Sequence, residues 1–229
     1  KSPPRIMKCY AISTWGAGQG VAVMVVLEDG NPKKAGYRRF KMNTVAGTDD
    51  YASMAETLAR RAAEYEKGAK GQFGIKPDLL LIDGGRGQVS AVQAALAGTQ
   101  LADVPMFGMV KDDKHRTRGL VSAAGGEIML AMHRGVFTFV TSIQDETHRW
   151  ANDYRRRMQK SRAYSSTLQS VPGVGPATSR ALMAHFKTVS AVKEASEEQL
   201  AGAKGVSRAA ARAVYAHFHP QPEQPSAET

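Results

Sequence analysis

The first 42 residues carry the patterns of β-strands. Segments 6–14 and 20–30 are rich in β-branched and apolar residues, and the second ends on the turn signal Asp29-Gly30. Segment 37–42 alternates, which predicts a third antiparallel strand with a basic edge. Its two faces would carry Tyr37, Arg39 and Lys41 on one side, and Arg38, Phe40 and Met42 on the other.

Helical and strand patterns then follow each other along the chain. Asp49 and Asp50 precede segment 54–68, whose apolar positions recur at helical spacing and stop at Gly68, so cap, period and terminator agree on a helix. The short apolar runs 79–83 and 104–110 predict buried strands. The segment between them, 90–98, predicts a helix.

The remainder of the first 164 residues is less regular. Segment 111–126 is charged and glycine-rich, which predicts an exposed loop that could include a short hairpin ending at 127–132. A long helix is predicted from about 141 to 164. The order of elements then describes an antiparallel meander extended by parallel strands through helical crossovers. This α/β arrangement, a mixed sheet with flanking helices, resembles the ribonuclease H-like folds.

Two matched helical hairpins occupy residues 166–218. Their central glycines, Gly173 in VPGVGP and Gly205 in AKGVSR, allow positive φ and a close approach of the backbone to a phosphate, while each following helix begins with free N–H groups. Glycines that only cap ordinary helices are the alternative for a single copy, and two copies favour DNA backbone binding. The residues predicted to bind DNA here are Gly173, Gly175, Gly205, Val206 and Ser207.

Composition narrows the class of protein. The 229 residues carry a net charge of +10, which favours phosphate-rich partners, although charge alone does not choose nucleic acid over a membrane surface or a solvated face. A single cysteine, Cys9, excludes an internal disulfide framework and a cysteine-based zinc site, and fits a reducing cytoplasm. There is no signal-peptide core and no apolar stretch near the ~20 residues that span a bilayer.

We expect three regions. Residues 1–163 form the α/β domain, 164–219 a small all-α tandem helix-hairpin-helix domain, and 220–229 a proline-rich, polar and disordered tail. The chain begins without an initiator methionine, and we expect it to be a piece of a longer protein.

Candidate chemistry lies in two segments. Asp83 ends a buried apolar strand, a position that can hold a carboxylate rigidly at a sheet edge, and the glycines after it leave room for a ligand. A turn or helix-cap Asp is the alternative. Asp145 and His148 would share a helix face, so that Asp145 could orient the second ring nitrogen of His148, with Glu146 beside them. Such a cluster could equally be a surface ion-pair patch.

Four motifs in order, YRRFKM, LLLIDGGRGQ, DETHR and VPGVGP, together resemble the C-terminal half of the UvrC family, the nuclease subunit of bacterial nucleotide excision repair. The resemblance runs from about residue 5 to 219. It implies a ribonuclease H-like endonuclease that makes the incision 5′ of a lesion with Mg²⁺ or Mn²⁺, and hairpins that hold double-stranded damaged DNA. AKGVSR resembles the second hairpin, with Ser207 in place of a glycine. The implied partners are a UvrB-type helicase-like subunit and a UvrA-type damage sensor.

By that resemblance, the catalytic set is an Asp on the first strand, Asp83 and His148. The family's first strand reads roughly C-[FY]-D-I-S, whereas this chain has Ala11 at the position of the Asp. A methyl group supplies neither a metal ligand nor charge, so we expect this chain to be nearly inactive. Either an Asp has been changed to Ala in order to trap an intact complex, or the chain is a natural paralogue that kept only the DNA grip.

Basic residues near these motifs are candidates for phosphate contacts. They are Arg38, Arg39, Arg86 and Lys111. A solvated surface role is the alternative for each, since lysine and arginine are usually exposed. Lys111 is the strongest candidate because it ends a strand close to the expected site.

Overall fold

The computed structural model describes residues 2–15, 19–42, 49–112 and 117–220. The chain divides into two compact units, Lys1–Arg155 and Arg156–Thr229, and each is described separately. The division falls within a long helix, α3 (Arg134–Gln169), as does the predicted boundary after residue 163. No helix in the described ranges is long and apolar enough to cross a bilayer.

An eight-stranded mixed sheet forms the first unit. Its strands are β1 (Ile6–Trp15), β2 (Gln19–Glu28), β3 (Asn31–Pro32), β4 (Arg38–Lys41), β5 (Leu79–Ile82), β6 (Met106–Lys111), β7 (Thr117–Val121) and β8 (Glu127–Met129). The order across the sheet is β3-β2-β1-β5-β6-β7-β8, with β4 also paired to β2. The pairs β1–β5 and β5–β6 are parallel and the others are antiparallel, which confirms the predicted meander with parallel extensions.

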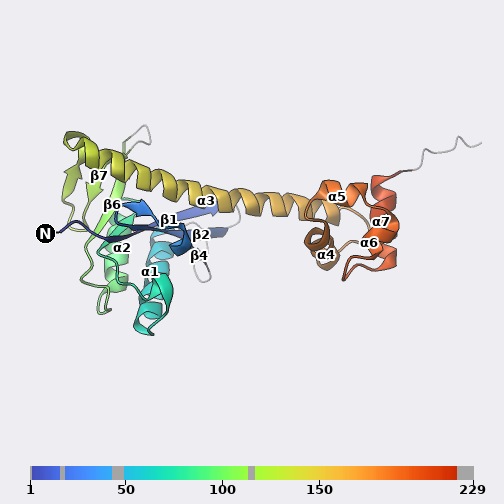
Figure 1. Cartoon of the computed structure of the whole chain (residues 1–229), viewed down its shortest axis with the longest axis horizontal. Helices are drawn as coiled ribbons and strands as arrows, with labels where there is room; N and C mark the ends of the chain where they lie inside the picture. The colour runs from blue at the N-terminus through green and yellow to red at the C-terminus, as the bar shows by residue number, and fades with distance from the viewer. Residues whose placement is uncertain (1, 16–18, 43–48, 113–116, 221–229) are drawn as a thin grey trace, which may run out of the picture. The chain divides into compact units, whose positions relative to one another are not determined.

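Helices cover both faces of this sheet (Figure 1). Helices α1 (Asp50–Glu66) and α2 (Arg86–Leu96) lie on one face, and the first part of α3 lies on the other. Short 3₁₀ turns occupy Lys34–Gly36, Gly71–Phe73 and Leu130–Met132. Because both faces are covered, the central strands are buried along most of their length. The predicted α/β fold class is confirmed.

The predicted cap and terminator of α1 are both present. The Asp49 carboxylate accepts hydrogen bonds from the backbone N–H groups of Tyr51 and Ala52, both at 3.0 Å. Gly68, with φ of +73°, follows the last turn. The helix therefore begins and ends close to the residues that its sequence indicates.

The prediction of an exposed loop over 111–126 is wrong for residues 117–121. These residues form β7, which pairs with β6 and β8, so the short hairpin ending near residue 129 is present. Thr117 and Val121 are buried, and Gly119 approaches so closely that a Cβ there would lie 2.6 Å from the carbonyl oxygen of Ile128. A charged, glycine-rich sequence can form a strand where neighbouring strands bury alternate residues.

Two buried basic side chains, one on β1 and one on α1, lie side by side. Lys8 and Arg61 are almost completely buried. Lys8 Nζ donates hydrogen bonds to the carbonyl oxygens of Gln72 (2.6 Å) and Ile75 (2.7 Å). Arg61 Nη2 reaches the same two oxygens at 3.2 and 3.1 Å. Two basic groups thus share two neutral acceptors in the interior.

The second unit is helical. It contains α4 (Pro176–Phe186), α5 (Val189–Glu194), α6 (Glu197–Ala201) and α7 (Arg208–Phe218). One apolar cluster joins them, centred on fully buried Leu182, Leu200 and Val214. The two hairpins therefore share a single core.

Candidate active site and nucleic-acid interface

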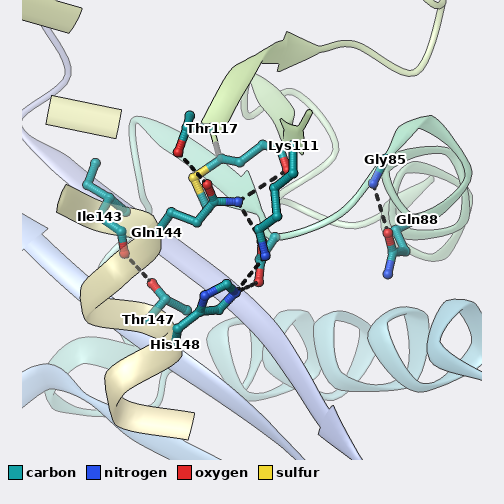
Figure 2. A network of polar contacts seen from close by, with 10 residues as sticks. Gly85, Gln88, Lys111, Thr117, Ile143, Gln144, Thr147 and His148 are labelled. Atoms are coloured by element: carbon teal, nitrogen blue, oxygen red, sulfur yellow. Dashed lines mark hydrogen bonds and ion pairs between the residues drawn. The ribbon is translucent and has the colours of Figure 1, made fainter. Parts of the chain in front are cut away.

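Four side chains labelled in Figure 2 meet that of Asp83 on the sheet face that α3 covers. Asp83 follows β5, Lys111 ends β6, and Thr117 begins β7, while Gln144 and His148 lie one turn apart on α3. The ends of two adjacent parallel strands supply Asp83 and Lys111, so both reach the same edge of the sheet. The predicted residues Asp83, His148 and Lys111 are brought together.

Asp83 is the centre of the cluster. Its Oδ2 lies 2.5 Å from His148 Nε2, and its Oδ1 accepts a hydrogen bond from Gln144 Nε2 at 2.8 Å. Lys111 Nζ lies 3.4 Å from Oδ1. The side chain of Asp83 is 11% exposed, against 38% for His148, so the carboxylate lies deeper in the site than the imidazole.

Two side chains with opposite hydrogen-bonding needs contact Nε2 of His148. Nε2 lies 2.5 Å from a carboxylate oxygen, which can only accept, and 2.9 Å from Lys111 Nζ, which as an ammonium can only donate. A protonated Nε2 would satisfy Asp83 and repel Lys111, and a bare Nε2 would do the reverse. Nε2 therefore cannot satisfy both neighbours at once, and only with Nε2 unprotonated would the Asp83 oxygen and the His148 nitrogen both present lone pairs to a cation.

The pKa of Asp83 is below its ordinary value. Burial alone would raise it, but hydrogen bonds from His148 and Gln144 and the charge of Lys111 outweigh that effect. The carboxylate is therefore ionised at neutral pH, which is the state that binds a cation.

Ala11 lies beside Asp83 on the neighbouring strand. Tyr10 pairs with Ile82, and the backbone N–H of Asp83 donates to the carbonyl oxygen of Tyr10 at 2.8 Å, so the next residues in register are Ala11 and Asp83. Both side chains face α3, since Ala11 packs in a cluster with Ala151. Neighbouring strands are about 4.8 Å apart. A carboxylate at position 11 would therefore lie next to that of Asp83.

The residues present do not complete a metal site. Asp83 and His148 supply an oxygen and a nitrogen, which suit a divalent cation. Among the described residues no group of three His, Cys, Asp or Glu side chains could hold a metal ion. Ala11 is 1% exposed in an apolar cluster with Val21 and Val23, and it offers no donor atom.

The structure does not bring Asp145 to His148. Asp145 is exposed, and in the described part of the chain no hydrogen bond joins it to the imidazole. Glu146 instead accepts hydrogen bonds from Tyr37 Oη (2.9 Å) and from Arg149 Nε (2.6 Å). Gln144 and His148, which are i and i+4, share the helix face toward the sheet, and Asp145 lies to one side of it.

The candidate basic residues separate by position. Arg38 lies on the opposite face of the sheet, where its Nη1 donates to the carbonyl oxygens of Ala35 and Tyr37. Arg39 faces α3, and its guanidinium carbon lies 3.6 Å from the ring centroid of Trp150. It belongs to the same cross-strand row as Ala11, since it pairs with Val23, which pairs with Ala11.

Arg86 and the glycines after Asp83 have local roles. Arg86 Nε donates to the carbonyl oxygen of Ala123 at 3.1 Å. A Cβ at Gly84 would overlap Oε1 of Gln88, which accepts from the backbone N–H of Gly85 and so caps α2. Gly84 therefore makes room for a side chain of the protein itself, rather than for the ligand that the sequence suggested.

Two residues of the site, Gln144 and Thr117, were missed by the sequence reasoning. Gln144 Oε1 accepts a hydrogen bond from Thr117 Oγ1 at 2.6 Å. A polar residue four positions before His148 is a signal that could have identified Gln144. Thr117 has no such signal, because only the pairing of β7 with β6 brings it to α3.

The second unit contains the two predicted hairpins as matched turns. Gly173 and Gly205 have φ of +83° and +89°. In each turn the N–H of the following valine, Val174 or Val206, donates a hydrogen bond of 3.0 Å to the carbonyl oxygen of the residue three positions earlier. The helix starts differ. Ser207 Oγ accepts from the N–H of Ala210, whereas Gly175, before α4, has no side chain with which to cap it.

The fold defines a class: a ribonuclease H-like α/β domain followed by a helix-hairpin-helix tandem. A model of the UvrC RNase H endonuclease domain matches residues 1–151, and a model of the SAM-like helix-hairpin-helix tandem matches residues 165–219. The chain belongs to the UvrC family. The resemblance that its motifs indicated is confirmed.

Curated relatives agree with this assignment. The chain is 42% identical over 217 residues to the UvrABC system protein C of Acetivibrio thermocellus, and 40% identical over 217 residues to that of Alkaliphilus oremlandii. Each match covers 89% of this chain and 34% of the relative, so the chain spans about a third of their length. A solved structure of the catalytic domain of human Endonuclease V matches 56% of this chain and 61% of its own, with 18% identity and a TM-score of 0.32.

Proposed function

We propose that residues 1–163 are a divalent-metal DNA endonuclease domain, which makes the 5′ incision in bacterial nucleotide excision repair, and that Ala11 leaves this chain nearly inactive. The observation that carries the proposal is the convergence of Asp83 and His148 beside Ala11. Two donors of the kinds that hard cations accept meet there, and the next position along the row carries a methyl group.

Each residue of the site has a part in the proposal. Asp83 and His148 would hold Mg²⁺ or Mn²⁺, together with a carboxylate at position 11. A bound ion of this kind lowers the pKa of the attacking water and stabilises the leaving oxygen. Lys111, with 29% of its side chain exposed, would contact a phosphate oxygen beside the ligands. Arg39, in the same row, would contact a neighbouring phosphate.

We propose that the hairpins bind double-stranded damaged DNA. Their positive-φ glycines and the starts of α4 and α7 offer backbone N–H groups to phosphates, independent of sequence. We propose that the lesion is found by a UvrA-type sensor and a UvrB-type subunit in the bacterial cytoplasm, because the curated relatives are named as components of a UvrABC system.

Restoring the carboxylate tests the catalytic proposal. Ala11→Asp should give Mg²⁺- or Mn²⁺-dependent incision of lesion-containing duplex DNA in the presence of the UvrA-type and UvrB-type subunits. Ala11→Asn is the matched control, since it has the same shape and no charge, and it should stay inactive. A folded Ala11→Asp protein that binds DNA and still makes no incision would count against the proposal.

A second function, a DNA-binding module without catalysis, is favoured by the same alanine and by the two complete hairpins. It predicts that truncation after Tyr164 removes most of the DNA affinity and much of its salt dependence. Binding by residues 1–164 as tight as that of the whole chain would show that the hairpins are not the main grip. Under this reading, Ala11→Asp would add no incision.

A further inference from the structure

A buried chain of hydrogen bonds reaches the candidate active site from β7. It runs from Thr117 through Gln144, both labelled in Figure 2, to the carboxylate of Asp83. Gln144 is 2% exposed and Thr117 is 7% exposed, so water competes little with either hydrogen bond. The second amide hydrogen of Gln144 points to the carbonyl oxygen of Met109 at 3.5 Å. Nothing in the UvrC motifs named above assigns a role to either residue.

The direction of this chain is fixed by chemistry. An ionised carboxylate only accepts hydrogen bonds, so the atom of Gln144 that faces Asp83 must be the amide nitrogen. The amide oxygen then faces Thr117, and the threonine hydroxyl must donate to it. A flipped amide would face the carboxylate with its oxygen and would leave two acceptors in repulsive contact. Asp83 therefore sets the amide orientation of Gln144, and the hydroxyl of Thr117 donates to the amide oxygen and holds the amide in place.

The carboxylate of Asp83 depends on this support. Asp83 follows the last residue of β5 and precedes two glycines, so its backbone continues into a turn rather than a strand. Gln144 holds Oδ1, and this leaves Oδ2 directed at His148. Without Gln144, the remaining polar partner of Oδ1 among the described residues would be Lys111 at 3.4 Å, on a long and flexible side chain.

We propose that Gln144 is a positioning residue for Asp83 and that Thr117 holds the amide of Gln144 in place. The inference rests on the proposed function of the site, since the oriented oxygen is the one that would face the metal ion. Partners of this kind, one step removed from a ligand, typically change metal affinity or activity roughly 10- to 100-fold when they are lost.

The test uses the whole chain with Ala11→Asp as its parent. Thr117→Val keeps the shape of the side chain and removes the hydroxyl, whereas Thr117→Ser keeps the hydroxyl. We expect Thr117→Val to lower kcat roughly 10-fold with unchanged affinity for DNA, and Thr117→Ser to retain most of the activity. Gln144→Leu, which removes the amide, should lower kcat roughly 100-fold.

A second measurement does not depend on incision. Binding of Mn²⁺, followed by the electron paramagnetic resonance signal of the free ion, should weaken roughly 10-fold in Thr117→Val and hardly at all in Thr117→Ser. Urea unfolding followed by tryptophan fluorescence shows whether each variant is folded. A variant of Gln144 that fails to fold leaves the Thr117 pair as the decisive comparison.

The outcomes separate the two proposals. If Ala11→Asp itself neither binds Mn²⁺ nor cuts DNA, the proposed function is wrong. If it does both, and Thr117→Val and Thr117→Ser have equal kcat and equal Mn²⁺ affinity, the positioning role is overturned. A loss in both Thr117 variants that follows their stability rather than the hydroxyl would also overturn it.

Discussion

The buried amine of Lys8 makes the stability of the first unit depend on pH, and the change that tests this is Lys8→Met. Lys8 Nζ donates to the carbonyl oxygens of Gln72 and Ile75. A neutral amine has two N–H groups, which match these two acceptors without adding a second charge beside Arg61. Methionine fills similar space, and the two carbonyl oxygens keep Arg61 as a partner.

The size of this pH dependence follows from the shift in the pKa of Lys8. Burial, and after it the charge of Arg61, lower the pKa of Lys8 from 10.5 to about 7. Between these values the unfolded chain holds one more proton at Lys8 than the folded chain, so the free energy of unfolding rises with pH by about 1.4 kcal/mol per unit. Buried Cys9, whose pKa is raised, acts in the opposite direction above pH 9. From about pH 7.5 to about pH 9 the gain is about 2 kcal/mol.

Urea unfolding followed by tryptophan fluorescence measures this gain. Both tryptophans, Trp15 and Trp150, belong to the first unit, so the signal reports on that unit alone. The parent chain should become more stable across the window, and Lys8→Met should lose that slope. Lys67→Met is the matched control, because the Lys67 side chain is 72% exposed and its removal should leave the slope unchanged.

Equal slopes for the parent and Lys8→Met would refute the reasoning. They would mean that Lys8 keeps its proton in the folded chain, with the two carbonyl oxygens stabilising an ammonium as well as water does. A slope that falls in Lys67→Met as well would assign the pH dependence to net charge rather than to burial.

Three further predictions concern packing and the hairpins. Tyr37→Phe removes the hydrogen bond to Glu146 and should lower the stability of the first unit by about 1 kcal/mol. The loss should appear as a lower midpoint of urea unfolding, and an unchanged midpoint would contradict this prediction. Leu182→Ala empties a fully buried position and should destabilise the second unit by about 2 to 5 kcal/mol, measured as faster hydrogen exchange in residues 176–218. Gly173→Ala and Gly205→Ala each place a side chain at positive φ, which costs about 1 to 2 kcal/mol of stability. Each should weaken the binding of duplex DNA, measured by fluorescence anisotropy at fixed salt. Unchanged affinity would exclude a role for these turns in DNA binding.

Periodic and capped elements were predictable from the sequence. The helix that begins after Asp49 and the apolar strand before Asp83 carry their own local signals, and both are present. β7 was indicated only as part of a possible short hairpin in an exposed loop, since its burial comes from β6 and β8 on either side and not from its own composition. Lys8 was not recognised as buried either, because a central strand covered on both faces has no outward position for a polar residue.

The site was predictable where single positions carry the chemistry and unpredictable where it depends on pairs far apart in the chain. Asp83 and His148 were named from their own surroundings and lie in contact. Thr117 and Gln144 are 27 residues apart and meet only after the sheet forms. The two faces of the third predicted strand were separated correctly, but the sequence did not indicate which face carries the site, so Arg38 was grouped with Arg39.

The apolar surroundings of Ala11 have an evolutionary consequence. The methyl group packs with Val21, Val23 and Ala151, and a carboxylate there would bring an unpaired charge into an apolar cluster next to Asp83. Under the proposed function, an acid at this position would help to hold the metal ion and would destabilise the domain when no ion is bound. Alanine would then give the more stable scaffold for DNA binding.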